Sequence, residues 1–147
     1  MGTLLRFADI LAREAPSNAL RIALQRAKGV RIGRDVFLGY GVYLDVSCPQ
    51  LIEIQDHGRI GPRVIILAHN RPGDAWMNHI GQIEAPVRIE RHAAIYSGAI
   101  IMPGVTVGEC AIVREGAVVV ESVPPYTVVA GSPARIIEQL PRDKATL

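Results

Sequence analysis

The chain has 147 residues, of which 49% are hydrophobic and 5% aromatic, and its formal net charge is +2. This length suits one domain with an aliphatic core, mixed charges without a basic run argue against a nucleic-acid partner, and no run reaches the roughly 20 apolar residues of an integral membrane segment. The first residues lack a secretory leader, and Cys48 and Cys110 lack the spacing of metal ligands, so we expect reduced thiols and a cytoplasmic protein.

Residues 1–29 are expected to form an N-terminal helical cap. Apolar residues recur at helical spacing, at Leu4, Phe7, Ile10 and Leu11. Pro16 breaks this run, and Asn18 is predicted to cap a second helix that closes at Gly29. Such helices would pack over the first of the repeats that follow and cover their exposed end. A helix lying on a membrane surface is the less favoured alternative, because its polar face mixes acidic and basic residues.

A six-residue rhythm runs through residues 30–131. The first position of each unit holds a bulky aliphatic residue, and the fifth holds a small or β-branched one. From residue 89 onward the first positions are Ile89, Ile95, Ile101, Val107, Val113 and Val119, and the fifth positions are Ala93, Ala99, Val105, Ala111, Ala117, Val123 and Val129. An α-helix repeats its apolar face every 3.6 residues and would drift against this period. The period therefore predicts an all-β solenoid of hexapeptide repeats, with short strands joined at regular corners.

Two interruptions break the rhythm. The segment Leu44–Ile54 is longer than one unit, so a bulge is expected near Pro49. After Ile66 the clean register returns only at Ile89, which predicts an inserted loop over about residues 70–88.

The chain end, residues 132–147, is expected to leave the repeats. Pro124 and Pro125 close the last repeat, because proline cannot continue a strand ladder. Residues 134–140 are predicted to form a short C-terminal helix, and the last residues a loose tail.

Three motifs carry a family resemblance: IMPGVTVGE, the ending PPYTVVAGSPARII, and IGPRVIILAHN before the inserted loop. With them, residues 30–140 resemble the hexapeptide-repeat acyltransferases, and are similar to maltose and galactoside O-acetyltransferases, serine acetyltransferases and small sugar acetyltransferases of polysaccharide biosynthesis. The resemblance implies a left-handed parallel β-helix and a homotrimer with active sites between neighbouring chains. It also implies acetyl-CoA as co-substrate, and no metal.

In similar enzymes a histidine at the position of His69 acts as general base. A sugar hydroxyl is a poor nucleophile, and an imidazole can remove its proton as it attacks the thioester. His69 shares its place in the repeat with His57 and His92, so a left-handed corner is the competing explanation. Asp45 would orient the imidazole or bind the acceptor, with a turn-capping role as the alternative. His79, in the loop, is a second candidate base.

Further residues are candidates for binding. Asn70, which stands where the similar pattern has Asp, and Trp76 are candidates for contacting the acceptor, Trp76 either as a stacking wall or as an anchor for the loop. The candidates for binding acetyl-CoA are Ser97, Gly98, Glu115, Gly116 and Arg135. Glu115 and Glu121 depart from the family pattern, and a carboxylate near a phosphate would weaken binding unless Arg114 compensates.

The expected function is transfer of an acetyl group to a hydroxyl of a sugar or glycan precursor, by direct transfer with His69 as base. The alternatives are N-acetylation of an amino sugar and a scaffold without catalysis. A zinc enzyme resembling the γ-class carbonic anhydrases is disfavoured, because their close HxxxxH pair is missing from the sequence.

Overall fold

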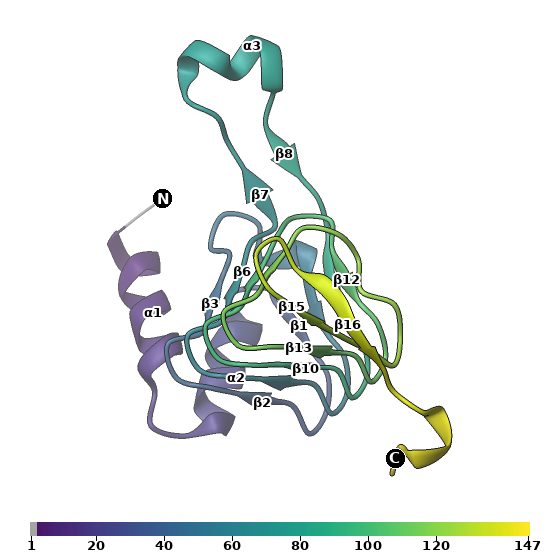
Figure 1. Cartoon of the computed structure of the whole chain (residues 1–147). Coiled ribbons are helices and arrows are strands. Elements are labelled where there is room, and N and C mark those ends of the chain that lie inside the picture. Colours follow the sequence, from purple (N-terminus) through teal and green to yellow (C-terminus); the bar gives the residue numbers. More distant parts are fainter. Residues whose placement is uncertain (1–2) are drawn as a thin grey trace.

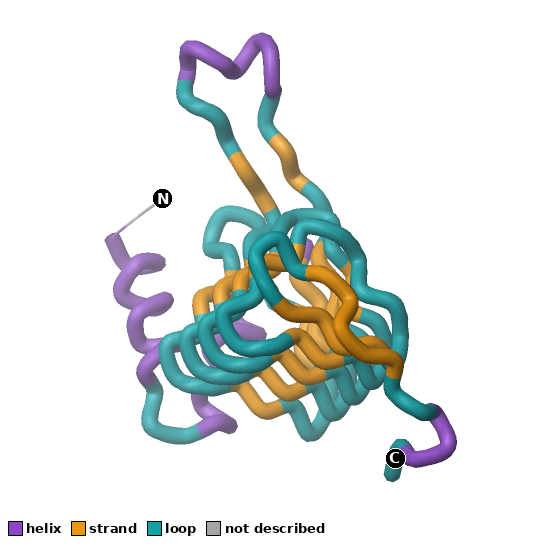
Figure 2. The backbone as a smooth tube through the Cα atoms, viewed as in Figure 1, coloured by secondary structure: helices purple, strands orange, loops and turns teal. Residues whose placement is uncertain are grey.

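The structure is a computed structural model that describes residues 3–147, with side chains described from residue 7 onward. After two helices, successive short strands are placed in turn on three sheets, A, B and C (Figures 1 and 2). Sheet A contains β1 (Arg31–Ile32), β4 (Ile52–Ile54), β9 (Val87–Ile89) and β12 (Thr106–Val107). Sheet B contains β2 (Phe37–Leu38), β5 (Arg59–Ile60), β10 (Ala94–Ile95), β13 (Ile112–Val113) and β15 (Thr127–Ala130). Sheet C contains β3 (Tyr43–Leu44), β6 (Ile65–Ile66), β11 (Ile100–Ile101) and β14 (Val118–Val119).

Each circuit of the three sheets makes one coil, the arrangement of a parallel β-helix. Coil 1 is formed by β1–β3, coil 2 by β4–β6, coil 3 by β9–β11 and coil 4 by β12–β14. Coil 5 begins with Val123, which bridges to Val107 of β12, and continues in β15. Neighbouring coils pair in parallel register, as Ile60 with Ile95 and Ile95 with Val113 in sheet B. Every aliphatic first position from Ile89 to Val119 and every fifth position from Ala93 to Val129 is buried, which confirms the six-residue period.

The corners between sheets carry the irregular segments. The B–C corners are residues 39–42, 61–64, 96–99 and 114–117, and the C–A corners are residues 45–51, 67–86, 102–105 and 120–122. The short 3-10 helix η1 (Pro49–Leu51) takes up the extra residues at the first C–A corner, as predicted.

The inserted segment is an ordered arm that leaves the second C–A corner (Figure 1). Its base is the antiparallel pair β7 (His69–Asn70) and β8 (Ile83–Glu84), and its tip holds η2 (Asp74–Trp76) and α3 (Met77–Ile80). The predicted end at residue 88 is wrong, because Val87 and Arg88 already belong to β9 and Val87 is buried in the coil.

The chain end forms a strand, so the predicted C-terminal helix over residues 134–140 is wrong. β16 (Arg135–Gln139) pairs antiparallel with β15 and is followed by η3 (Arg142–Lys144). The β-branched pair Ile136 and Ile137 favours a strand, and this strand satisfies the free edge of β15 in the last coil.

The N-terminal helices are α1 (Thr3–Glu14) and α2 (Asn18–Ala27). Ser17 caps α2 by accepting a hydrogen bond from the Leu20 amide at 3.1 Å, so Asn18 is not the cap. Asn18 ties α2 to coil 1 instead, through bonds to the backbone of Val36 and Leu38.

The prediction that α1 packs its apolar face over coil 1 is wrong. Phe7, Ile10 and Leu11 are at least half exposed, whereas Ala12 and Ala15 are buried, and the side chain of Leu4 lies outside the described residues. Within residues 3–147, no helix is both long and apolar enough to cross a bilayer.

Candidate active site

Asp45 and His69 form a hydrogen-bonded pair at neighbouring C–A corners. Asp45 follows β3 in coil 1, and His69 opens β7 at the base of the arm above it. The Oδ2 atom of Asp45 lies 2.5 Å from the His69 Nδ1 and also accepts the backbone amides of Ala68 and His69 at 2.9 and 3.0 Å. The Asp45 side chain is fully buried. One carboxylate therefore fixes both the ring and the backbone of this histidine.

The protonation of Asp45 determines the tautomer of His69. Burial alone would raise the pKa of Asp45, but the bonds from His69, Ala68 and Ser47 outweigh it, and the pKa of this carboxyl is lowered. An ionised carboxylate can only accept hydrogen bonds, so Nδ1 is the donor. The lone pair of Nε2 is then free to take a proton, as a general base requires.

The backbone separates His69 from the other histidines of the repeat. His57 and His92 have φ angles of 62° and 58° and stack at 4.6 Å between ring centroids, as expected of left-handed corner residues. His69 lies in a strand instead, and its side chain has a hydrogen-bonding partner of its own. The corner explanation therefore holds for His57 and His92 and does not apply to His69.

Two further residues close to this pair were missed from the sequence. Glu84 stands opposite His69 in the β7–β8 register. Burial, the charges of Glu84 and Asp45, and a hydrogen bond to Glu84 all raise the pKa of the Cys48 thiol. A raised pKa favours the protonated thiol, which is a poor nucleophile. The only signal in the sequence was the length of the insertion, which does not reveal the pairing of its two ends.

The residues predicted to bind acetyl-CoA, except Arg135, lie together on the B–C corners of coils 3 and 4. Gly98 and Gly116 have φ angles of 71° and 66°, and a Cβ on either would meet no atom within 4 Å. The Gly116 amide donates to the Ser97 carbonyl at 3.0 Å, which joins the two corners. An open, smooth surface of this kind lets a long ligand approach the backbone.

Glu115 does not present a free charge at this corner. Its carboxylate accepts a hydrogen bond from Arg114 Nε at 2.9 Å. The pKa of Glu115 is lowered, first by a backbone hydrogen bond and then by Arg114. At Glu115, where the sequence departs from the family pattern, the negative charge is therefore paired with the positive charge of Arg114.

Arg135 is exposed at the start of β16 and follows Ala134, whose amide donates to the Val118 carbonyl of coil 4 at 2.8 Å. It lines a cavity of about 340 Å³ at the end of the coil, together with Glu121. Asn70 lines a smaller cavity of about 220 Å³ between the strands of the arm.

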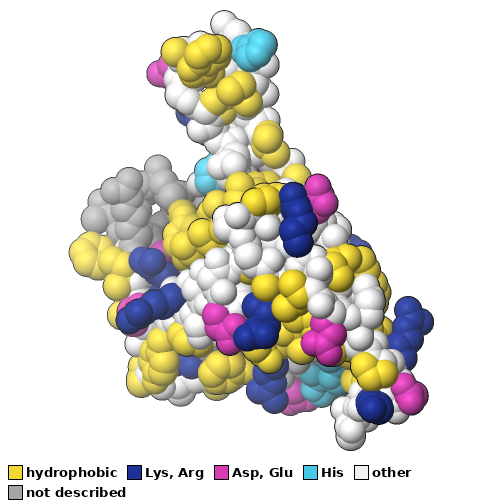
Figure 3. Space-filling model, viewed as in Figure 1, with side chains coloured by type: hydrophobic (Ala, Val, Ile, Leu, Met, Phe, Trp, Pro, Cys, Tyr) yellow, Lys and Arg dark blue, Asp and Glu magenta, His cyan; other side chains and the backbone are white. Residues whose placement is uncertain are grey.

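Trp76 lies near the tip of the arm, 60% exposed, with its ring edge-on to His79. Hydrophobic side chains gather at this tip in the space-filling view (Figure 3). Because β7 and the loop after it separate Trp76 from the base of the arm, a single chain does not bring this ring to His69.

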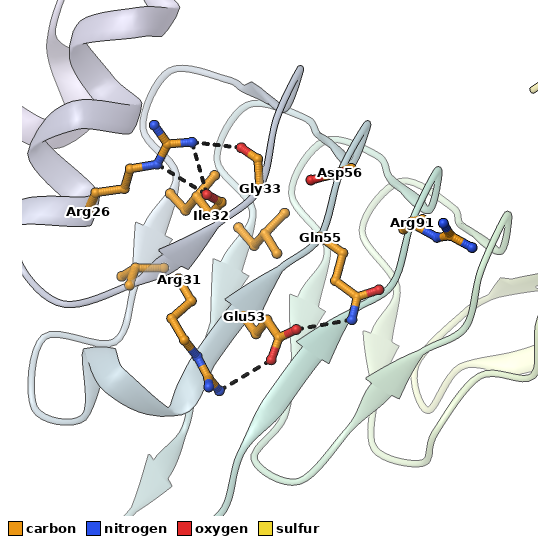
Figure 4. Close-up of a pocket in the computed structure, with 10 residues that line it drawn as sticks. Arg26, Arg31, Ile32, Gly33, Glu53, Gln55, Asp56 and Arg91 are labelled. Carbon is orange, nitrogen blue, oxygen red and sulfur yellow. Dashed lines mark hydrogen bonds and ion pairs between the residues drawn. The ribbon is translucent and has the colours of Figure 1, made fainter.

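A groove on sheet A is not the candidate site. It encloses about 720 Å³ beside β1 and β4 (Figure 4). Its charged groups are already satisfied: Arg26 donates to the carbonyls of Ile32 and Gly33, and Arg31 pairs with Glu53 at 3.3 Å. Asp56 pairs with Arg34, and Arg91 with Glu109. Across the described residues, no three potential metal ligands come together.

Comparison with known proteins gives the following relatives. The chain is 31% identical over 144 residues to the Schizosaccharomyces pombe protein C18B11.09c, whose name places it provisionally among acetyltransferases, covering 92% of this chain and 68% of that protein. It is 29% identical over 117 residues to the galactoside O-acetyltransferase of Escherichia coli, covering 78% of this chain and 57% of that enzyme. The chain thus spans about two thirds of these relatives' length or less.

Among solved structures, the chain resembles the hexapeptide-repeat acetyltransferase VCA0836 of Vibrio cholerae in complex with acetyl coenzyme A. The TM-score is 0.77 and the identity 28%, covering 93% of this chain and 85% of the other. No model of a protein family matches the chain.

Proposed function

Because the chain belongs to the hexapeptide-repeat acetyltransferase family, we propose that it transfers an acetyl group from acetyl-CoA to a hydroxyl of a sugar or glycan precursor. The observation that carries this proposal is the Asp45–His69 pair, with Nδ1 held by a buried carboxylate and Nε2 left free. The Escherichia coli relative acts on galactosides, which supports a sugar as the acceptor class.

The proposed reaction is a direct transfer. His69 Nε2 takes the proton of the acceptor hydroxyl while its oxygen forms a bond to the thioester carbonyl carbon. The tetrahedral adduct then breaks its carbon–sulfur bond, and the departing CoA sulfur receives the proton from the imidazolium. Asp45 stabilises the transient positive charge on the ring. Positioned proton transfer of this kind typically contributes about 10²- to 10⁴-fold to the rate.

The donor and the base lie on opposite margins of sheet C. His69 belongs to the C–A corners, and Ser97, Gly98 and Gly116 to the B–C corners. We therefore propose that the site is completed between copies, with the corners of one chain facing His69 of the next. A left-handed coil and a homotrimer with parallel axes satisfy this requirement.

The outer face of sheet C supports this assembly. Its four outward side chains are apolar and stand in one register: Tyr43, Ile65, Ile100 and Val118. Each is partly exposed in the single chain. The outward residues of sheet A, by contrast, include Arg31, Glu53 and Arg88. An apolar column of this kind is typical of a surface buried between subunits.

The test is release of CoA thiol from acetyl-CoA in the presence of sugars, nucleotide sugars, amino sugars and serine. His69→Ala should lower kcat by about 10²- to 10⁴-fold, since the proton acceptor is lost. His79→Ala, at the tip of the arm, is the matched control and should retain activity. Full transfer by His69→Ala to every accepted sugar would overturn the mechanism, and transfer confined to amino sugars would establish N-acetylation instead.

A further inference from the structure

The first C–A corner holds both strands of the arm. Asp45 fixes β7, through the amides of Ala68 and His69 and through the His69 ring. Further along the same corner, the buried thiol of Cys48 donates a hydrogen bond to the Glu84 carboxylate of β8. Figure 1 shows the two strands leaving the coil together. Glu84 is therefore held in a defined place, next to the residues of the proposed mechanism.

Glu84 and His69 lie on the same face of the β7–β8 pair. They stand directly opposite each other in the antiparallel register. Side chains in this relation point to the same face, and their Cβ atoms are about 4.5–5.5 Å apart. Their partners agree with this placement, because Asp45 and Cys48 belong to one corner. A ligand group that reaches the free Nε2 atom of His69 therefore also lies beside Glu84.

The Glu84 carboxylate can accept further hydrogen bonds from a ligand. The residue is exposed, and its Oε1 atom accepts a bond from Gln82 Nε2 at 2.5 Å. A carboxylate offers about four acceptor positions, so Cys48 and Gln82 leave others open. Among the side chains described, no lysine or arginine pairs with Glu84. The carboxylates of the coils that do pair with arginine are Glu53, Asp56, Glu109 and Glu115.

The surroundings of the imidazole carry an excess of negative charge. Asp45 and Glu84 are both carboxylates, and only Asp45 gains a cationic partner when His69 takes a proton. Arg71, which follows β7 in the arm, already pairs with Asp74 at 3.3 Å. Unlike charges attract and like charges repel at these distances, and more strongly where water is excluded. The field of Glu84 thus favours a neutral or positively charged ligand over an anion.

We propose that Glu84 selects the acceptor of the proposed acetyl transfer. Its carboxylate accepts a hydrogen bond from a hydroxyl or ammonium group next to the hydroxyl that His69 deprotonates, and it repels a carboxylate or phosphate at that place. Neighbouring hydroxyls on a pyranose ring are hydrogen-bond donors, so one ring can satisfy His69 Nε2 and Glu84 together. The inference rests on the proposed function, and it narrows the acceptor class to neutral and amino sugars.

The test compares acceptors that differ only in charge. They are methyl hexopyranosides in which one hydroxyl is kept or is replaced by an amino or a sulfate group, at each ring position in turn, so that one series flanks the acetylated hydroxyl. Release of CoA thiol gives kcat/KM, and NMR of the product identifies that hydroxyl. In the flanking series, kcat/KM of the wild type should fall from amino through hydroxyl to sulfate. Glu84→Gln keeps the size of the side chain but loses its charge, and should lower the amino-to-sulfate ratio by about tenfold or more.

Asp74→Asn, which removes a carboxylate from the tip of the same arm, is the matched control and should keep the wild-type ratio. An unchanged ratio in Glu84→Gln, even with all rates lowered together, would mean that Glu84 only fastens β8 to the corner. That result overturns the inference and leaves the transferase intact.

Thermal shift with acetyl-CoA separates the acceptor from the donor. Wild type, Glu84→Gln and Asp74→Asn should show the same shift. Its loss in Glu84→Gln alone would place Glu84 at the donor, which also overturns the inference. A wild type that releases no CoA thiol with any acceptor would overturn the proposed function, and this inference with it.

Discussion

Asp45 is the residue on which the proposed chemistry depends most directly. In Asp45→Asn the side chain loses its charge, and its amide nitrogen can face Nδ1, which favours the wrong tautomer of His69. We expect kcat to fall by about 10²- to 10⁴-fold with little change in the KM for acetyl-CoA. Steady-state kinetics at several acetyl-CoA concentrations measure this split. A loss confined to KM would mean that Asp45 binds substrate and does not orient the base.

The lowered pKa of Asp45 predicts how stability depends on pH. Because this carboxyl has a lower pKa in the folded chain than its ordinary value of 3.8, it stabilises the fold at pH values above 3.8. This contribution is lost as pH falls through 3.8 towards the lower folded pKa. The difference in unfolding free energy between wild type and Asp45→Asn, measured in urea, should shrink as pH falls below 4. A difference that grew below pH 4 would contradict the assignment.

At the residue scale, the sequence indicated which residues to choose for the site, but it did not indicate which side chains contact one another. His69 and Asp45 could be chosen because a family pattern places a base and a carboxylate there, while spacing alone left His69 equivalent to His57 and His92. His69 differs from those two because it lies in a strand, and that strand forms by pairing across the arm with residues far away in the sequence. Glu84 was missed for the same physical reason.

At the scale of the coil, some glycines are required because neighbouring coils leave no space for a Cβ, whereas others have open space around them. A Cβ on Gly39 would lie 2.5 Å from the Pro62 backbone nitrogen in the next coil, so Gly39→Ala must push two coils apart. We expect it to lower the unfolding free energy by about 1–3 kcal/mol or more, as overpacking does. Thermal and urea unfolding with circular dichroism would measure the loss.

Gly73, at the start of η2, is the matched control. A Cβ there would meet nothing within 4 Å, and its φ angle of −60° suits any residue. Gly73→Ala should leave stability unchanged, or raise it by about 0.4–1 kcal/mol through the unfolded state. Equal destabilisation by both variants would mean that coil contact is not what glycine provides at position 39.

The elements were predicted well where a local period repeats and poorly where it stops. Each coil imposes the same alternation of large and small inward residues, so the sequence from Ile89 to Val129 specifies its own register. The segment after Gly131 has no such period, and residues 134–140 were predicted to be helical from their local sequence alone. Their pairing with β15 is a tertiary effect, and it outweighs local propensity.

At the scale of the whole molecule, the apolar face of sheet C predicts an obligatory assembly. Ile100→Glu places a charge in the middle of that face without touching the Asp45–His69 pair. We expect the variant to run as a monomer in light scattering and to lose acetyl transfer, because the donor and base then belong to separate chains. Thr106→Glu, on the outer face of sheet A beside Arg88, should remain trimeric and active. An active monomeric Ile100→Glu would show that one chain suffices.

The arm can change in length and sequence without changing the coils on either side of it. Its two ends are bridged where they leave the coil, by the Ala85 amide bonded to the Ala68 carbonyl at 3.0 Å, and coil 3 begins immediately afterwards at Val87. Doubling the length of such a closed loop costs only about 0.6 kcal/mol. We therefore expect residues 71–82 to tolerate changes in length and sequence at little cost in stability, while His69 at the base of the arm stays in place.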